Sequence, residues 1–284
     1  SMASRQRIVL TSCPSCAAPS QVRPSRLTSS VVAARARLAT ACLAKVILAD
    51  LGGRRLKLAI PDQDGGLRLL CERVWPNQPE DAALAELGQQ LAEHGGPLWL
   101  SSSRPAAVAA LQSSAVIAPH LRVVTAAQVP LARNTTGTGS DRLLAALAGS
   151  ERAQGACLIA DLGTAWTLDC VDAQRVFRGG AIGPGLKVQI DALAAACPHL
   201  DAPASTDSEA IPNSTASAVR GGTLLALAHA LSGLADQWQA SIGSAPRYLT
   251  GGDAALLAPV LGPDWLLTED LVLHGLAIAA EQLQ

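Results

Sequence analysis

Two stretches of the chain carry the residue types that bind the phosphates of a nucleotide. They read VILADLGGRRLKLAI (46–60) and CLIADLGTAWTLDCVDA (157–173), and each places Asp-Leu-Gly directly after an apolar run. Glycine lets backbone N–H groups come close to a phosphate and point at it. The carboxylates of Asp50 and Asp161 repel a phosphate, so they act on it through a cation or a water bound to one. The repeat therefore predicts two phosphate-binding turns.

A simpler interpretation is that each Asp-x-Gly stretch is an ordinary hairpin turn that binds nothing. Two copies in the same strand–turn–strand context, 111 positions apart, favour phosphate binding, as does a Gly-Gly turn in LTGGD (249–253). The chain has no GxxxxGK[ST] sequence and no HRD or DFG set. The two commoner templates for phosphoryl transfer are therefore excluded.

A third carboxylate, Asp141, lies in GSDRLLAALAG (139–149), where the pattern begins a helix with Ser140 as its expected N-cap. The N-terminus of a helix stabilises an anion. A carboxylate within hydrogen-bond reach of an alcohol acts as a general base and accelerates a reaction by about 10²–10⁴. From these residues alone, a carboxylate that merely begins a helix is the favoured interpretation.

The elements that position these residues alternate between strands and helices. Strand pairs are predicted at 45–60 and 157–172, and further strands at 97–100, 121–127 and 246–250. Helices are predicted at 80–96, 105–112, 140–149, 186–197, 215–238, 253–261 and 270–283, and RGGAIGPG (178–185) is predicted to be a turn. The pattern indicates an α/β protein of two similar halves related by duplication.

Charge and composition narrow the class of function. Residues 1–49 hold seven Arg or Lys and no acidic residue, so the rest of the chain carries a formal charge of about −8. This negative net charge argues against nucleic acid as a partner. No uninterrupted apolar run approaches the ~18 residues needed to span a bilayer, so no membrane partner is expected.

The cysteines favour a cytoplasmic location. Cys157, Cys170 and Cys197 lie in apolar or helical stretches, as reduced core thiols do. The pair in CPSC (13–16) has metal-ligand spacing, but no second pair completes a zinc site. Residues 1–44 are interpreted as an N-terminal extension outside the fold, although their Arg- and Ser-rich composition overlaps that of a transit peptide.

Seven motifs of the chain resemble, in order and spacing, those of the type III pantothenate kinases. They are DLGGRRLK, GSDR, DLGTAWTLD, GGAIGPGLKVQIDAL, NSTASAVRGG, LTGGDA and DLVLHGL. The resemblance implies duplicated actin-like (ribonuclease H-like) domains, at 45–152 and 153–284, that face a central cleft. It implies phosphorylation of pantothenate to 4′-phosphopantothenate by ATP, the first step towards coenzyme A, in a cytoplasmic homodimer.

The resemblance also implies roles for individual residues. One set matches the ATP-binding positions: Asp50, Leu51, Gly52, Gly53, Arg54, Arg55, Leu56, Lys57 and Thr164. Another matches positions that bind pantothenate: Gly139, Ser140, Asp141, Arg142 and Thr215, the last from the partner subunit. Asp141 matches the general base, Asp50 lies near Mg²⁺ through water, and Asp161 matches the ligand of a monovalent cation, K⁺ or NH₄⁺. Gly179, Gly180, Pro184 and Gly185 match a segment that lines the cleft.

The chain departs from the family pattern in the first turn, where Gly53 and Arg54 stand at places usually held by Asn and by Thr or Ser. Arg54 either clamps a phosphate oxygen or fills the pocket. Ala132 stands where relatives often carry Tyr. Two alternatives therefore stay open beside the pantothenate kinase. One is a non-catalytic regulatory or accessory relative, and the other is a kinase for another small substrate on the same fold.

Overall fold

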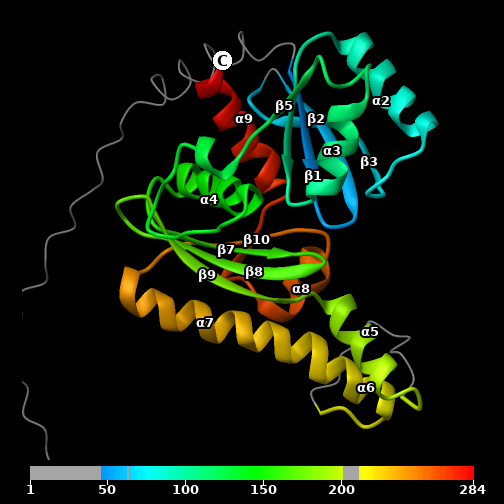
Figure 1. Ribbon diagram of the computed structural model, residues 1–284. Helices are drawn as coiled ribbons and strands as arrows, with labels where there is room; N and C mark the ends of the chain where they lie inside the picture. The colour runs from blue at the N-terminus through cyan, green and yellow to red at the C-terminus, as the bar shows by residue number, and fades with distance from the viewer. Residues whose placement is uncertain (1–45, 63, 201–210) are drawn as a thin grey trace, which may run out of the picture.

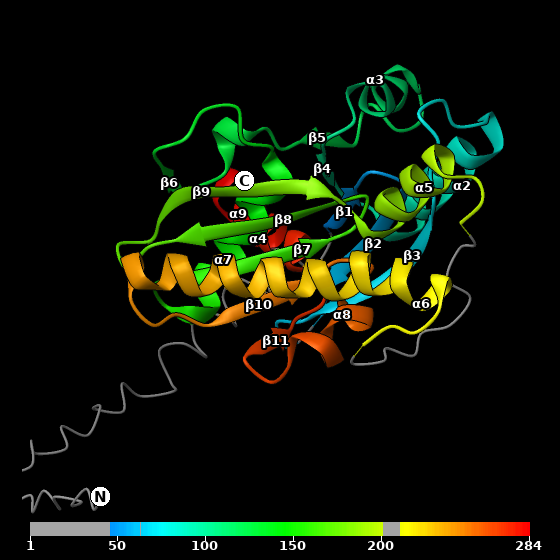
Figure 2. The ribbon, with the colours of Figure 1, turned by 90° about the horizontal axis from the view of Figure 1, so that it is seen from below.

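The computed structural model describes residues 46–62, 64–200 and 211–284 of the chain (Figure 1). The predicted N-terminal extension and its CPSC pair lie outside these residues. The described chain forms two mixed β-sheets, with helices between them and on their outer faces (Figures 1 and 2). The cysteines Cys71, Cys157, Cys170 and Cys197 are free thiols. Cys157 and Cys170 are buried as expected for core residues, whereas Cys197 is only half-buried.

The first sheet has five strands in the order β3-β2-β1-β4-β5. The strands are β1 (Ile47–Leu51), β2 (Arg55–Pro61), β3 (Leu67–Val74), β4 (Leu98–Ser102) and β5 (Leu121–Val123). Two helices connect β3, β4 and β5, namely α2 (Asp81–His94) and α3 (Pro105–Ser113). Strands β1, β2 and β3 pair antiparallel, whereas β4 and β5 continue the sheet in parallel with β1.

The second sheet repeats this order with one added strand, β11-β10-β7-β8-β9-β6. Its strands are β6 (Ala132–Arg133), β7 (Cys157–Leu162), β8 (Ala165–Val171), β9 (Val176–Pro184), β10 (Arg247–Thr250) and β11 (Trp265–Leu267). Strands β7 to β9 pair antiparallel and β10 and β11 run parallel to β7, as in the first sheet. The matching order confirms the predicted α/β fold of duplicated actin-like domains.

Four helical segments cover the outer face of the second sheet and extend beyond it (Figure 2). They are α5 (Leu186–Ala196), α6 (Thr215–Arg220), α7 (Ala226–Ile242) and α8 (Ala254–Leu261). A π-helical turn at Gly221–Leu225 joins α6 to α7, so that Thr215–Ile242 is one continuous helix.

By length and composition that helix could cross a membrane, with a mean hydropathy of 1.2 over its most apolar window. The sequence analysis considered uninterrupted apolar runs, and this helix includes polar residues. A core helix passes the same test, and Leu227, Leu231 and Ala235 of α7 are buried in the apolar cluster against the second sheet.

Two helices lie between the sheets and form the central core. Helix α4 (Ser140–Ala153) follows the first half of the chain but packs on β7 and β8, whereas α9 (Leu271–Leu283) follows the second half and packs on β1 and β4. The two helices also pack against each other (Figure 1). Gly275 permits this approach, because a Cβ atom there would overlap the backbone carbonyl of Leu144.

The structure corrects three details of the sequence analysis. RGGAIGPG is not a turn but most of strand β9, and Gly139 rather than Ser140 is the N-cap of α4. The strand expected at 121–127 ends at Val123, and a 3₁₀ turn follows at Ala126–Gln128. The domain boundary at 152/153 stays a prediction, and β6 and α9 each join elements from the other side of it.

The contact between α4 and α9 makes a prediction about stability. Gly275→Ala is expected to lower the free energy of unfolding by about 1–3 kcal/mol, because the added methyl group pushes the two helices apart. Gly233→Ala in α7 is the matched control, since nothing lies within 4 Å of a Cβ there. That change is expected to stabilise by up to about 1 kcal/mol. Urea denaturation measures both, and equal effects would contradict the packing argument.

Candidate active site

Strand periodicity directs Asp50 and Asp161 towards the space between the sheets. In β1 the odd-numbered residues pack in the outer apolar cluster of the first sheet, while Val46 and Leu48 pack in the central core. In β7 the even-numbered apolar residues pack in the outer cluster of the second sheet, while Cys157 and Ile159 pack in the central core. Side chains alternate along a strand, so both aspartates continue the inner rows.

The electrostatics place Asp50, Asp141 and Asp161 in one group. Burial raises the pKa of Asp50 to about 7, and the negative charges of Asp161 and Asp141 add to the shift. Burial also raises the pKa of Asp161 to about 6, with further contributions from Asp141 and Asp169. Charges shift one another's pKa in this way when they lie near one another and are partly shielded from water. The three predicted carboxylates therefore share one site.

The two predicted phosphate turns meet each other. A Cβ atom on Gly53 would lie 2.7 Å from Oγ1 of Thr164, so the tip of the first turn rests against the second. The Gly-Gly turn after β10 completes the junction, because Gly251 has a φ of +94° and a Cβ there would overlap Asp161. The N–H of Gly185 donates to the carbonyl of Thr164 at 2.9 Å. Three glycine-containing turns thus converge around Asp161.

Lys57 spans the two halves of the chain. Its Nζ donates to Oδ1 of Asp270, at the start of α9, over 2.7 Å. Burial alone would lower the pKa of Lys57, but the hydrogen bond and charge of Asp270, together with Glu72 and Asp50, raise it above its usual value. Lys57 also pairs in register with Asp50 across β1 and β2. A permanently charged ammonium therefore lies beside the carboxylates.

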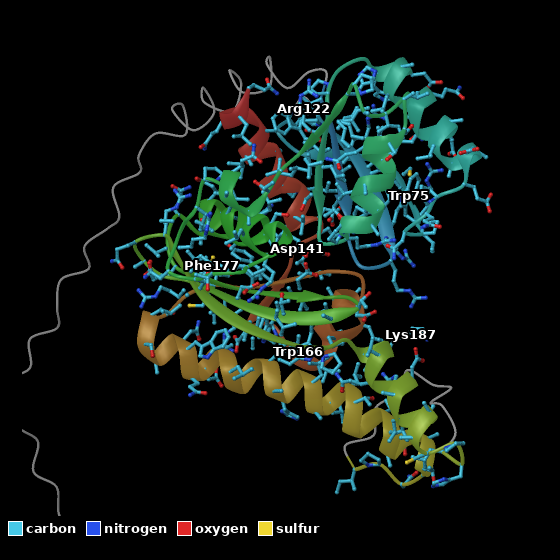
Figure 3. The ribbon with its side chains drawn as sticks, viewed as in Figure 1. Trp75, Arg122, Asp141, Trp166, Phe177 and Lys187 are labelled. Atoms are coloured by element: carbon cyan, nitrogen blue, oxygen red, sulfur yellow. The ribbon has the colours of Figure 1, made fainter. Side chains whose placement is uncertain are left out.

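Asp141 and Arg142 begin α4 with their side chains engaged. The backbone N–H of Arg142 donates to Oδ1 of Asp141 at 2.8 Å. The Arg142 guanidinium grips Asp169 of β8, with Nε 3.1 Å from each carboxylate oxygen and Nη2 also bonded. Burial raises the pKa of Asp169 to about 6, although Arg142 favours its charged form. The pair anchors the start of α4, and hence Asp141, to the second sheet. Figure 3 labels Asp141, which lies between α4 and the strands of this sheet.

The structure does not bring every predicted site residue into this group. Arg54 and Arg55 are exposed at the tip of the first turn, and Arg55 pairs with Glu72. Thr215 is exposed on the first turn of α6, which lies at the outer end of the α5–α7 layer, away from α4 (Figure 1). Ser140 is buried on α4 and Gly139 precedes it.

Sequence reasoning assigned no role to three residues that the structure adds: Ser101, Asp169 and Asp270. Asp169 and Asp270 lie inside motifs that the sequence analysis quotes. Side chains alternate between the two faces of a strand, and this alternation could have placed Asp169 on the same face as Asp161. Ser101 is fully buried on β4 in register with Asp50, and no local pattern marked it.

The carboxylates suit cations that keep part of their hydration. Among the described residues no group of three or more His, Cys, Asp or Glu is placed to hold a metal ion directly. Mg²⁺ at kinase sites commonly uses one or two carboxylates, several waters and substrate phosphates. Asp50 is a carboxylate that could hold such an ion in this way. Next to it, the hydroxyl of Ser101 is buried without a hydrogen-bond partner among the described residues.

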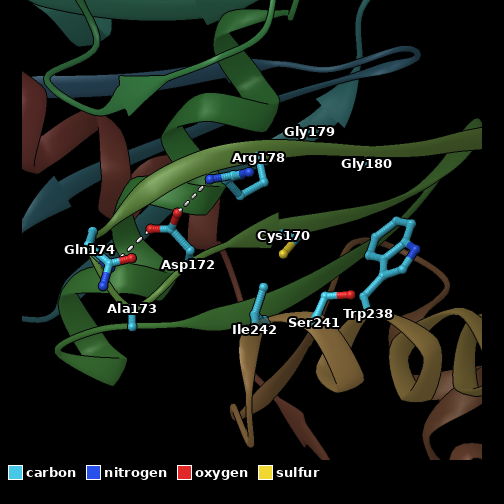
Figure 4. Close-up of a pocket in the computed structure, with 10 residues that line it drawn as sticks. All are labelled: Cys170, Asp172, Ala173, Gln174, Arg178, Gly179, Gly180, Trp238, Ser241 and Ile242. Atoms are coloured by element: carbon cyan, nitrogen blue, oxygen red, sulfur yellow. Dashed lines mark hydrogen bonds and ion pairs between the residues drawn. The ribbon is translucent and has the colours of Figure 1, made fainter.

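A separate cavity of about 610 Å³ lies on the outer side of the second sheet, between β8, β9 and the end of α7 (Figure 4). Its charged pair is Arg178 and Asp172, with Nη1 and Oδ2 3.2 Å apart. The Asp172 carboxylate also accepts hydrogen bonds from the N–H groups of Gln174 and Val176. These partners satisfy each other within the β8–β9 turn, and the cavity contains none of the carboxylates described above.

Comparison with known proteins assigns the family. The sequence profile of the type III pantothenate kinases matches residues 46–237. The chain is 33% identical to the type III pantothenate kinase of Chromobacterium violaceum over 236 residues, which cover 81% of this chain and 97% of that protein. The chain belongs to the type III pantothenate kinase family.

Other relatives agree with this assignment. The type III pantothenate kinase of Alkalilimnicola ehrlichii is 42% identical over 149 residues, covering 51% of this chain and 59% of that protein. The fold is also similar to the crystal structure of a Campylobacter jejuni protein named for the Baf family of transcriptional activators. That match has a TM-score of 0.57 and 17% identity, and it covers 84% of this chain and 98% of the other.

The raised pKa of Asp50 predicts how stability varies with pH in metal-free buffer. Between its ordinary pKa of 3.8 and its folded value of about 7, the folded protein binds more protons at this site than the unfolded chain. The free energy of unfolding therefore falls as pH rises through this range and then levels off. In Asp50→Asn this fall in the free energy of unfolding is expected to be absent.

The melting temperature of Asp50→Asn, measured in EDTA, is expected to exceed that of the unmodified chain by a few degrees at pH 8 and to match it near pH 3, below the ordinary pKa of 3.8. A change of 1 kcal/mol shifts the melting temperature of a protein of this size by roughly 2–4 °C. Asp64→Asn removes an exposed charge outside the group and serves as the control. A difference for Asp50→Asn that is the same at both pH values would contradict the assignment.

Proposed function

We propose that the protein transfers the γ-phosphate of ATP to the primary alcohol of pantothenate, forming 4′-phosphopantothenate, the first step of coenzyme A biosynthesis. Membership of the family supports this activity. The observation that carries the site assignment is the electrostatic contact of Asp50, Asp141 and Asp161 at the junction of two glycine turns. Two turns grip the phosphates, and a third carboxylate faces the acceptor.

Asp141 is the general base of this proposal. An alcohol is a weak nucleophile, and a carboxylate that accepts its proton during attack assists the reaction. Gly139 leaves room for this carboxylate, because a Cβ there would overlap Oδ1 of Asp141. Arg142, fixed by Asp169, holds the turn in place.

Cations balance the remaining negative charge. The family is a kinase family and uses ATP with a divalent metal. Asp50 is proposed to hold Mg²⁺ through water, and Asp161 to ligate a monovalent cation, K⁺ or NH₄⁺. When bound, these cations neutralise charge on the phosphates and the carboxylates. The ATP contacts proposed are the first turn, 50–57, and Thr164 of the second.

Pantothenate is proposed to contact Gly139, Ser140, Asp141 and Arg142 at the start of α4. Thr215 lies on an exposed helix end away from this group. Its proposed contact with substrate therefore requires the partner subunit of a homodimer. A cytoplasmic location is part of the same proposal.

One observation keeps a second candidate function in view. Gly53 and Arg54 replace two polar anchors of the first turn, and neither provides the amide or hydroxyl found there in relatives. A non-catalytic regulatory relative that retains the fold would tolerate this change. Turnover of ATP with pantothenate, Mg²⁺ and K⁺ distinguishes the two, and a panel of other small alcohols tests a kinase of different specificity.

Removing the base tests the mechanism. Asp141→Asn is expected to lower kcat by about 10²-fold or more, while the affinity for ATP changes by no more than a few-fold, because the amide cannot accept the alcohol proton. Steady-state kinetics and calorimetric titration with ATP measure the two effects. Asp236→Asn, an exposed carboxylate on α7, is the control. Undiminished turnover in Asp141→Asn would refute the role.

The monovalent cation gives an independent test. Asp161→Ala is expected either to abolish activity or to remove its dependence on K⁺, because the cation loses its charged ligand. Activity is measured across a K⁺ titration with the ionic strength held constant by a bulky organic cation. An unchanged K⁺ titration curve would show that Asp161 does not ligate the cation.

A further inference from the structure

The hydroxyl of Ser101 is a polar group that no other described residue satisfies. Ser101 is 0% exposed, and its Oγ has no hydrogen-bond partner among the described residues. The next residue, Ser102, is different, because its hydroxyl donates to the carbonyl of Leu51 and accepts from the N–H of Arg104. A buried hydroxyl without a partner costs free energy. An alanine would fill nearly the same space without that cost.

Strand register places this hydroxyl beside Asp50. Ser101 on β4 pairs with Asp50 on the parallel strand β1. Leu98 and Leu100 pack in the outer cluster while Trp99 packs in the central core, so Ser101 continues the inner row of β4. Neighbouring parallel strands lie about 4.8 Å apart. The Ser101 hydroxyl and the Asp50 carboxylate therefore share one face within reach of a common bridging group.

The neighbour of Ser101 on the β5 side is apolar. Val124 follows β5, is buried in the central core, and donates its N–H to the carbonyl of Leu100. The residue paired with Ser101 in the sheet is Asp50. The polar side of the Ser101 hydroxyl is therefore the side of Asp50, and a ligand that reaches both comes from there.

The second half of the chain repeats this arrangement. Thr250 on β10 pairs with Asp161 on the parallel strand β7, as Ser101 on β4 pairs with Asp50 on β1. Thr250 is also buried, at 3% exposed. Each carboxylate at the end of a first strand thus has a buried hydroxyl residue beside it on the next parallel strand. The same arrangement in both halves indicates that the buried hydroxyl beside each aspartate is a feature of the site.

We infer that Ser101 is a positioning residue for the divalent cation, with its hydroxyl accepting a hydrogen bond from a water in the hydration shell of Mg²⁺ beside Asp50. This inference rests on the proposed function for the identity of the cation. A hydroxyl in this place fixes the orientation of that water and, through it, the cation. Removal of a partner of this kind typically weakens metal binding by about 10–100-fold.

The test uses the full chain with a non-hydrolysable ATP analogue and Mn²⁺, whose binding is followed by electron paramagnetic resonance. Ser101→Ala is expected to weaken Mn²⁺ binding about ten-fold, without changing the affinity for the analogue in EDTA. Ser101→Cys, which keeps a side chain of similar shape but hydrogen-bonds weakly, is expected to behave in the same way. In the kinase assay the Mg²⁺ concentration for half-maximal rate rises, while the KM for pantothenate is unchanged.

Ser150→Ala is the matched control, because Ser150 is also 0% exposed but its hydroxyl donates to the carbonyl of Leu147 within α4. Mn²⁺ binding in Ser101→Ala that equals the unmodified chain, or that weakens no more than in Ser150→Ala, would overturn the inference. The Mn²⁺ measurement needs no turnover. A chain that binds Mn²⁺ through Ser101 but phosphorylates no pantothenate would contradict the proposed function and still support this inference.

Discussion

Repulsion among the carboxylates between the two sheets is the constraint on which the rest of this structure depends. Burial raises the pKa of Asp50 and of Asp161, and the charge of Asp141 adds to both shifts. Such an arrangement persists only where the surrounding fold fixes it. Lys57 and Arg142 offset part of the charge, but each is bonded to a further carboxylate, Asp270 and Asp169. Negative charge remains in excess among these side chains, as the proposed binding of cations requires.

The exchange of helices between the halves supplies the necessary rigidity. Each sheet receives its inner helix from the other half of the chain, so α4, which carries Asp141, is packed on the strands that carry Asp161 and Asp169. Helix α9 in turn is packed on β1 and carries Asp270 at its start, where it meets Lys57. Separating the halves would expose the central core and break the contact between Lys57 and Asp270. The fold thus links apolar burial to the position of each carboxylate.

The sequence predicted most elements of this fold and the residues at the ends of β1 and β7. Apolar alternation followed by Asp and Gly is a local signal, and so is the amphipathic pattern of α2 or α4. The segment 178–185 was misread because four glycines and a proline suggest a turn. In the structure the strand needs those glycines, since a Cβ at Gly180 would overlap the carbonyl of Leu168. Asp270, Asp169 and Ser101 acquire their roles from contacts across the sheets or between the halves, which no local pattern records.

The contact between the two turns bears on the unusual residue at position 53. A side chain there would meet Thr164, with a Cβ 2.7 Å from Oγ1 and 3.0 Å from Cβ of that residue. Threonine is branched at Cβ and has few rotamers to escape such a contact. Glycine in the first turn and threonine in the second are therefore complementary.

The polar group at the junction comes from Thr164, in the second half of the chain, instead of from a side chain of the first turn. The guanidinium of Arg54, which is exposed next to this junction, adds positive charge at the edge of an acidic site. The altered turn is thus compatible with a phosphate grip in which the second half provides the hydroxyl and the first half provides backbone N–H groups and a cation.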